Sequence, residues 1–112
     1  MSSSVDNWWE MEPFTANPQV PIVVQFGTMA CALCPDVSRR INALMQTHVF
    51  EWHYHDATTS NLAVELTVSK LPAMLVFHTV EKYELYQKMR GDDVEQAIRA
   101  SCAARLVLDE DI

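Results

Sequence analysis

Two short apolar runs dominate the hydrophobic pattern of the chain. They span Pro21–Thr28 (PIVVQFGT) and Pro72–His78 (PAMLVFH). Apolar runs of this length are typical of strands that are buried on both faces. Alternation of apolar and polar positions predicts two further strands, at Phe50–Asp56 and Tyr83–Met89. The chain therefore carries four predicted strands, two of them fully buried.

Helices are predicted between the strands, where apolar positions recur at steps of three and four. One covers Pro35–Val49 and a second covers Thr58–Ser69. A third begins at Asp92, with that residue as the N-cap and Glu95 in the capping-box position. A weaker pattern predicts another helix over residues 4–14.

The order of the elements predicts the fold class. Strands that alternate with helices imply parallel pairing through right-handed crossovers. The last two strands are joined by the short turn Thr79–Lys82, which predicts an antiparallel hairpin. We expect an α/β fold with a central mixed sheet of four to five strands and helices on both faces. The 112 residues suffice for one domain, spanning 1–112.

The charge of the chain excludes several classes of partner. The net charge is −7, and only 8 residues are Lys or Arg. Such a chain lacks the basic surface that nucleic acids and anionic membranes require. Its apolar runs are also too short to span a bilayer. The acidic N-terminal stretch has no apolar core of a secretory signal, so a cytoplasmic location is expected.

The pair Cys31 and Cys34 is the motif that carries chemistry. The Cys31-Ala32-Leu33-Cys34 segment lies between a predicted buried strand and a predicted helix. Cysteines three residues apart at the start of a helix can form a small disulfide ring. Cys31 lies nearer the positive end of the helix dipole, which favours the reactive thiolate, and Cys34 lies deeper. This arrangement favours thiol–disulfide exchange.

Other interpretations of the cysteines stay open. Cys31 and Cys34 could bind a metal with His53 or His55, which share one face of a predicted strand. They could also be inert structural residues. The remaining cysteine, Cys102, lies on the apolar stripe of the last helix, which favours a buried small hydrophobic residue over a regulatory thiol.

Three segments resemble the thioredoxin family. Ile22–Cys34 resembles the family's strand that runs into its Trp-Cys-Gly-Pro-Cys site. Lys70–Ala73 (KLPA) resembles the family's Ile-Pro-Thr loop, and Gly91 matches the family's glycine before the last helix. The resemblance covers roughly positions 20–106 and implies a thioredoxin-like fold and a protein disulfide oxidoreductase.

The resemblance also implies roles for matched residues. Cys31 would be the nucleophile and Cys34 the resolving thiol. Pro72 would be a cis-proline, and Leu71 would pair its backbone with an extended substrate. Ala30, at the position of the family's tryptophan, would shape the substrate surface. The implied partners are protein disulfides as substrates and a reductase or glutathione as electron donor. The chain carries no nucleotide-binding glycine motif, so no organic cofactor is expected.

Departures from the family pattern point to a specialised partner. Ala32 and Leu33 replace the family's Gly-Pro, and Gln25 stands where the family has a buried carboxylate. Trp52 stands where that carboxylate has its lysine partner. Pro35 disfavours helical geometry at the residue before it, so the helix is expected to start late. Three hypotheses follow: an oxidoreductase, a thioredoxin-like adaptor or chaperone with little turnover, and a metal-binding protein.

Overall fold

The elements of the structure follow the predicted order. The computed structural model describes residues 14, 15 and 17–105. Within them the elements are β1 (Ile22–Gly27), α1 (Cys34–Leu44), β2 (Glu51–Asp56), α2 (Asn61–Glu65), β3 (Ala73–Thr79), β4 (Lys82–Tyr86) and α3 (Gly91–Ser101). Of the helix predicted over residues 4–14, only Phe14 is described, and it belongs to no helix.

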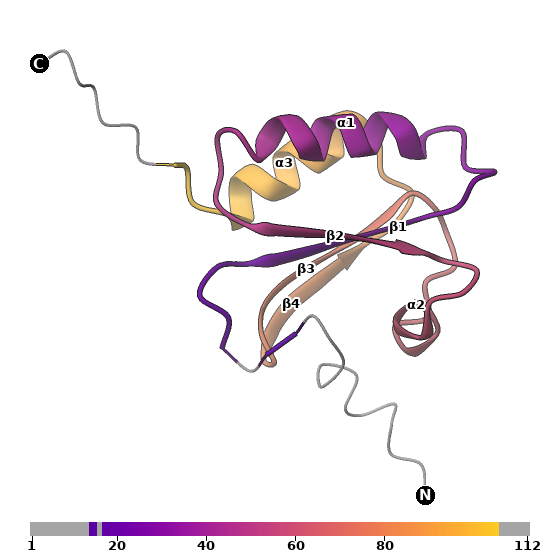
Figure 1. Cartoon of the computed structure of the whole chain (residues 1–112), viewed down its shortest axis with the longest axis horizontal. Helices are drawn as coiled ribbons and strands as arrows, with labels where there is room; N and C mark the ends of the chain where they lie inside the picture. Colours follow the sequence, from indigo (N-terminus) through magenta and orange to yellow (C-terminus); the bar gives the residue numbers. More distant parts are fainter. Residues whose placement is uncertain (1–13, 16, 106–112) are drawn as a thin grey trace, which may run out of the picture.

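A four-stranded mixed sheet in the order β2-β1-β3-β4 forms the centre of the fold. β1 pairs with β2 in parallel and with β3 antiparallel, and β3 and β4 form the predicted hairpin. Helices α1 and α3 cover one face of the sheet, and α2 lies on the other (Figure 1). The predicted α/β class, with a mixed sheet and helices on both faces, is confirmed.

The sheet separates two hydrophobic cores. Alternate residues of the central strands enter opposite cores, because successive side chains of a strand point to opposite faces. The core under α1 and α3 includes Val23, Ile41, Met74, Val76, Val94 and Ile98. The core on the α2 side includes Phe14, Val24, Phe26, Leu62, Leu75 and Phe77. Every residue of β1 is buried, as its continuous apolar run predicts.

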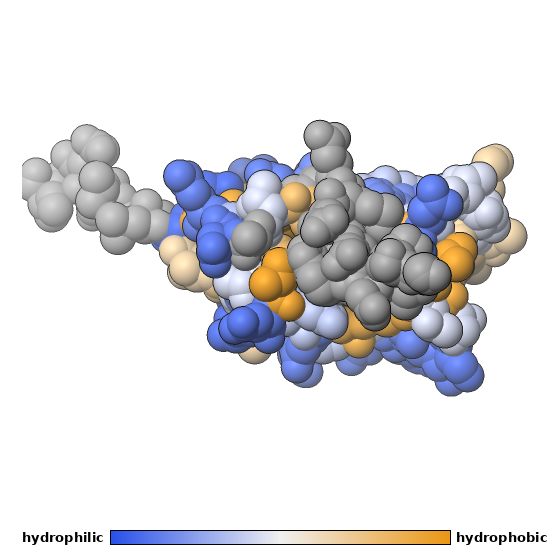
Figure 2. Space-filling model, turned by 90° about the horizontal axis from the view of Figure 1, so that it is seen from below, coloured by the Kyte–Doolittle hydropathy of each residue, from blue (hydrophilic) through white to orange (hydrophobic). Residues whose placement is uncertain are grey.

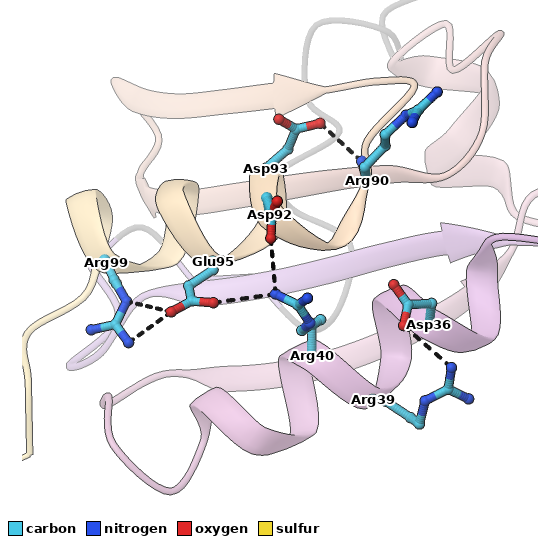
Figure 3. A network of polar contacts seen from close by, with 8 residues as sticks. All are labelled: Asp36, Arg39, Arg40, Arg90, Asp92, Asp93, Glu95 and Arg99. Carbon is cyan, nitrogen blue, oxygen red and sulfur yellow. Dashed lines mark hydrogen bonds and ion pairs between the residues drawn. The ribbon is translucent and has the colours of Figure 1, made fainter.

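Helices α1 and α3 lie side by side and are joined by ion pairs (Figure 3). Arg40 Nη1 lies 3.4 Å from Asp92 Oδ1 and 3.2 Å from Glu95 Oε1. The helices approach so closely that a methyl group at Gly91 would lie 2.9 Å from Asp36 Oδ2. Because these ion pairs are solvent-exposed, they contribute little stability individually. The ion pairs nevertheless bring Arg40 of α1 opposite Asp92 and Glu95 of α3.

The boundaries of α1 differ from the prediction. The expectation that Pro35 delays the helix is wrong, because α1 begins at Cys34 with Pro35 in its first turn. An N–H has no acceptor within the helix at that position, so proline is tolerated there. The helix also ends at Leu44 rather than Val49. The chain turns beyond it, and His48 forms an isolated bridge with Ala104.

Helix α2 is much shorter than the predicted Thr58–Ser69. It is capped by the Ser60 hydroxyl, which accepts the Ala63 N–H. It stops near Glu65 because Thr67 takes a left-handed conformation with φ 58°. That turn lets the Val68 N–H donate to Ala63 O and end the helix.

The N-cap of α3 is also displaced from the prediction. Arg90, and not Asp92, is the N-cap, and its backbone N–H donates to Asp93 Oδ2 at 2.9 Å. Glu95 therefore does not fill the predicted capping-box position. It instead pairs with Arg40 and Arg99.

The surface on the α2 side is mainly hydrophilic at its rim, with separate apolar side chains between (Figure 2). Val64 of α2 is one exposed apolar residue in this part of the chain, with 73% of its surface accessible. No helix of the described residues is long and apolar enough to cross a membrane.

We expect Ile41→Ala to lower the free energy of unfolding by about 2–5 kcal/mol, because it leaves a cavity in the core under α1. Arg39→Ala is the control on the same helix. It removes only an exposed pair with Asp36 and should change the free energy of unfolding by less than about 0.5 kcal/mol. Chemical denaturation measures both. Equal losses in the two variants would contradict the assigned core.

Candidate functional site

Cys31 and Cys34 form a disulfide at the start of α1. Their Cα atoms are 5.4 Å apart, and the Cys34 N–H donates to Cys31 O at 3.3 Å. The two cysteines differ in exposure: Cys34 is 3% accessible, whereas Cys31 is only partly buried. An attacking thiolate on Cys31 and a shielded partner at Cys34 is the arrangement that exchange chemistry requires.

The junction between β1 and α1 creates this asymmetry. β1 ends at Gly27, and the Cys31 N–H closes a turn by donating to Thr28 O at 3.2 Å. Cys31 thus lies in the turn, while Cys34 is the first residue of the helix. The unpaired N–H groups of a helix start favour negative charge nearby, which favours a thiolate at this position.

Gln25 links the central strand to α1 directly beneath the disulfide. Its side chain is fully buried, and Nε2 donates to Cys34 O at 3.3 Å. Its Oε1 accepts the Ser38 hydroxyl at 3.0 Å. Both polar ends of the amide are therefore satisfied without a charge. Trp52 is half-buried against the same core, so no buried ion pair stands at these two positions.

An uncharged depression surrounds Cys31. Its volume is about 340 Å³, and it is lined by Thr28, Ala30, Cys31, Ala32, Leu33, Leu71 and Pro72. The fold thus brings Ala30, Leu71 and Pro72 together with Cys31. The Leu71–Pro72 peptide bond is cis, as the family resemblance implies. Larger hollows of about 440 and 620 Å³ lie beside β4 and α3 and contain no cysteine, so volume alone does not mark the site.

Gln87 holds the loop that carries Leu71 and Pro72, a role the sequence analysis missed. Its Oε1 accepts the N–H groups of Ser69 and Lys70 at 2.8 and 2.9 Å. The Pro72 carbonyl in turn accepts the Met89 N–H at 3.0 Å. Hydrophobic periodicity carries no signal for such a contact, because it joins an exposed side chain to a distant backbone.

Gly27 leaves room for two side chains to meet at the end of β1. A methyl group at Gly27 would lie 2.6 Å from the Tyr54 hydroxyl oxygen and 2.9 Å from Cys34 Sγ. The glycine is therefore required by space. The chain has only two glycines, a rarity that indicates a particular backbone requirement at each of them.

The histidines proposed as metal ligands have other partners. His53 Nε2 lies 3.0 Å from Glu51 Oε1, and His55 Nδ1 lies 3.1 Å from the Ser60 hydroxyl. Burial, followed by the neighbouring His53, lowers the pKa of His55 below its ordinary value. Within residues 14, 15 and 17–105, no three His, Cys, Asp or Glu side chains gather as a metal site would require.

Cys102 lies away from the depression, in the core under α1 and α3. It is a free thiol, and 6% of its surface is accessible. Burial raises the pKa of Cys102 to about 11, because the charged thiolate is poorly solvated there. This environment is that of an inert, packed cysteine.

Solved thioredoxins share this fold. Thioredoxin from Plasmodium falciparum matches with a TM-score of 0.67 and 15% identity, over 94% of this chain and 85% of that chain. Thioredoxin O2 from Arabidopsis thaliana, in its oxidised state, matches with a TM-score of 0.61 and 18% identity, over 72% of this chain and 74% of that chain. Thioredoxin O1 from the same plant, also oxidised, matches with a TM-score of 0.62 and 17% identity, over 73% of this chain and 78% of that chain.

The chain therefore has a thioredoxin-like fold, as the sequence resemblance implies. No family model matches the chain, and no curated protein matches it significantly in sequence. Identities of 15–18% show a common fold and no more.

The raised pKa of Cys102 predicts a loss of stability at alkaline pH. Between its ordinary pKa of 9.0 and the folded value of about 11, the unfolded chain releases the Cys102 proton and the folded chain keeps it. The free energy of unfolding should therefore fall as pH rises through this window. Relative to Cys102→Ala, the wild type should lose about 1–2 kcal/mol between pH ~8.5 and ~10.5. A constant difference would contradict a buried thiol.

Proposed function

We propose that the protein is a thiol–disulfide oxidoreductase that exchanges the Cys31–Cys34 pair between dithiol and disulfide with protein substrates. The observation that carries the proposal is the unequal exposure of two linked cysteines at the start of α1. The thioredoxin-like fold supports it, since the neighbours that share the fold are named thioredoxins.

The exchange has two steps when the protein acts as a reductant. The Cys31 thiolate attacks a substrate disulfide, so that a mixed disulfide forms and one substrate sulfur leaves as a thiolate. Cys34 then loses its proton and attacks Cys31 Sγ, which releases the second substrate thiolate. The substrate gains two electrons, and Cys31 and Cys34 are joined. A reductase or glutathione must return two electrons to restore the dithiol.

The depression around Cys31 fits a substrate segment in extended form. Ala30, Leu71 and Pro72 line it beside the outer cysteine, and no lining residue is charged. A short extended peptide at Leu71 would add backbone pairing to these apolar contacts. Because Ala30 is small, it leaves open space where a larger side chain would contact the substrate, which favours a specialised partner.

A thioredoxin-like adaptor or chaperone with little turnover is the second candidate. Gln25, the buried polar side chain beneath Cys34, cannot accept a proton as a base. No carboxylate at position 25 is therefore present to accept the Cys34 proton in the second step. This observation favours slow resolution, and turnover measurements separate the two candidates.

The reduction potential of the Cys31–Cys34 pair tests the redox proposal. The protein is equilibrated in glutathione buffers of graded potential, alkylated, and analysed by peptide mass. We expect one two-electron transition confined to Cys31 and Cys34, and its midpoint gives the favoured direction of exchange. If no such disulfide forms at any potential, the oxidoreductase proposal fails.

Substitution of each cysteine tests the assigned roles. Cys31→Ser should abolish reduction of a protein disulfide, because the attacking thiolate is removed. Cys34→Ser should instead accumulate mixed disulfides, visible on non-reducing gels. Cys102→Ser is the matched control and should keep nearly full activity, since that thiol is buried away from the site. Turnover by Cys31→Ser would disprove the mechanism.

A further inference from the structure

Tyr54 on the neighbouring strand places its hydroxyl in the vicinity of Cys34. On β2 it is level with Gln25 of β1, and its hydroxyl lies over Gly27, on the α1 side of the sheet. The Tyr54 hydroxyl oxygen and Cys34 Sγ both lie within 3 Å of the point that a methyl group at Gly27 would occupy. The distance between the hydroxyl oxygen and the sulfur therefore cannot exceed the sum of their distances from that point, which are 2.6 Å and 2.9 Å. Tyr54 is 49% accessible, so its ring is not fully enclosed by neighbours.

Gln25, the buried polar residue bonded to the Cys34 backbone, has both ends of its amide engaged. Gln25 donates to the Cys34 carbonyl and accepts from Ser38, so its amide is directed at the backbone and at α1. The Tyr54 hydroxyl, in contrast, lies beside the space over Gly27, and Cys34 Sγ lies beside the same space. A hydroxyl is able to donate a hydrogen bond to a thiolate.

Charged groups on the surrounding elements do not supply this stabilisation. Asp36 on α1 and Asp56 at the end of β2 are carboxylates, which disfavour a second negative charge at Cys34. Asp56 is also held by the N–H and hydroxyl of Thr58. Lys70, on the loop before Pro72, is exposed, so water screens its charge.

We propose that Tyr54 is a further catalytic residue, whose hydroxyl donates a hydrogen bond to Cys34 Sγ when that sulfur becomes a thiolate. The proposal rests on the exchange function proposed above. When a donor thiolate bonds to Cys31 Sγ, the S–S bond breaks and its electron pair passes to Cys34 Sγ. Tyr54 keeps its own proton. The hydrogen bond makes Cys34 a better leaving group, and in the reverse step it raises the fraction of attacking thiolate.

Ionisation of Cys34 tests the proposed hydrogen bond without requiring activity. In a Cys31→Ser background, the rate of alkylation at the Cys34 peptide is followed against pH by mass. We expect Tyr54→Phe to raise the midpoint by about 0.5–1 pH unit, the effect of losing one hydrogen bond to the anion. An unchanged midpoint would overturn the proposal.

Tyr83→Phe is the matched control for the loss of one hydroxyl. Tyr83 stacks on Phe77, whose partner on β1 is Ile22, at the end of the sheet opposite Gly27. This variant should leave the Cys34 midpoint at its starting value. An equal shift in both tyrosine variants would show a general effect and would contradict the assignment to Tyr54.

The rate at which dithiothreitol opens the Cys31–Cys34 disulfide gives the second readout. With both cysteines intact, Tyr54→Phe should slow opening at pH ~7 by about two- to fivefold, because the leaving thiolate loses its donor while its charge is only partly developed. An unchanged rate would refute the catalytic role. The two proposals can fail separately. If the wild type does not reduce protein disulfides, the proposed function is wrong. The alkylation midpoint of Cys34 still tests the proposed hydrogen bond from Tyr54.

Discussion

The complete burial of β1 is the constraint on which the rest of the structure depends. The strand pairs on both edges, and both of its faces lie in hydrophobic cores, so none of its six residues meets water. Any polar side chain on it must find a partner inside the protein. Gln25 does so with Ser38 and the Cys34 carbonyl. The same requirement that stabilises the core therefore fixes the start of α1, and with it the position of the cysteines.

The contrast between the cysteines follows from that fixed helix start. Cys34 is the first residue of α1 and lies against the strand, whereas Cys31 lies in the turn that leaves Gly27. A second, independent anchor brings the opposite wall of the depression into place, because Gln87 binds the backbone of the loop before Pro72. The surface around Cys31 is thus built from backbone anchoring and uncharged side chains. On the proposed function, this surface would recognise a partner by shape and backbone pairing more than by charge.

Local pattern was sufficient for the parts of the fold that burial dictates. The apolar runs located β1 and β3, and the two cysteines that the sequence places between a strand and a helix form a disulfide there. Pattern failed where a backbone turn or a distant contact decides the outcome. The apolar positions after Glu65 still pack against the core, but Thr67 takes a left-handed turn, so the helix predicted there stops early. Asp92 was predicted to start α3, but Arg90 is its N-cap because Asp93 accepts the Arg90 N–H, and the pairing of Glu95 with α1 is visible only in the fold. The sequence analysis also missed Gln87 and Tyr54, because both lie near residues that are distant in the sequence.

Because the interior beneath the disulfide is uncharged, any polar stabilisation of Cys34 Sγ must come from residues closer to the surface. A buried carboxylate at position 25 would need a buried cation, and Trp52 supplies none, so an amide is the polar group that this core accommodates at low cost. An amide offers no proton acceptor near the resolving sulfur. Gly27, by lacking a side chain, opens the remaining approach, and the hydroxyl of Tyr54 lies along it. Because Tyr54 is half-exposed, its hydroxyl can follow the sulfur when the disulfide opens, which a packed side chain could not do. The uncharged core and the glycine at the strand end thus leave the approach to Cys34 Sγ open to the Tyr54 hydroxyl.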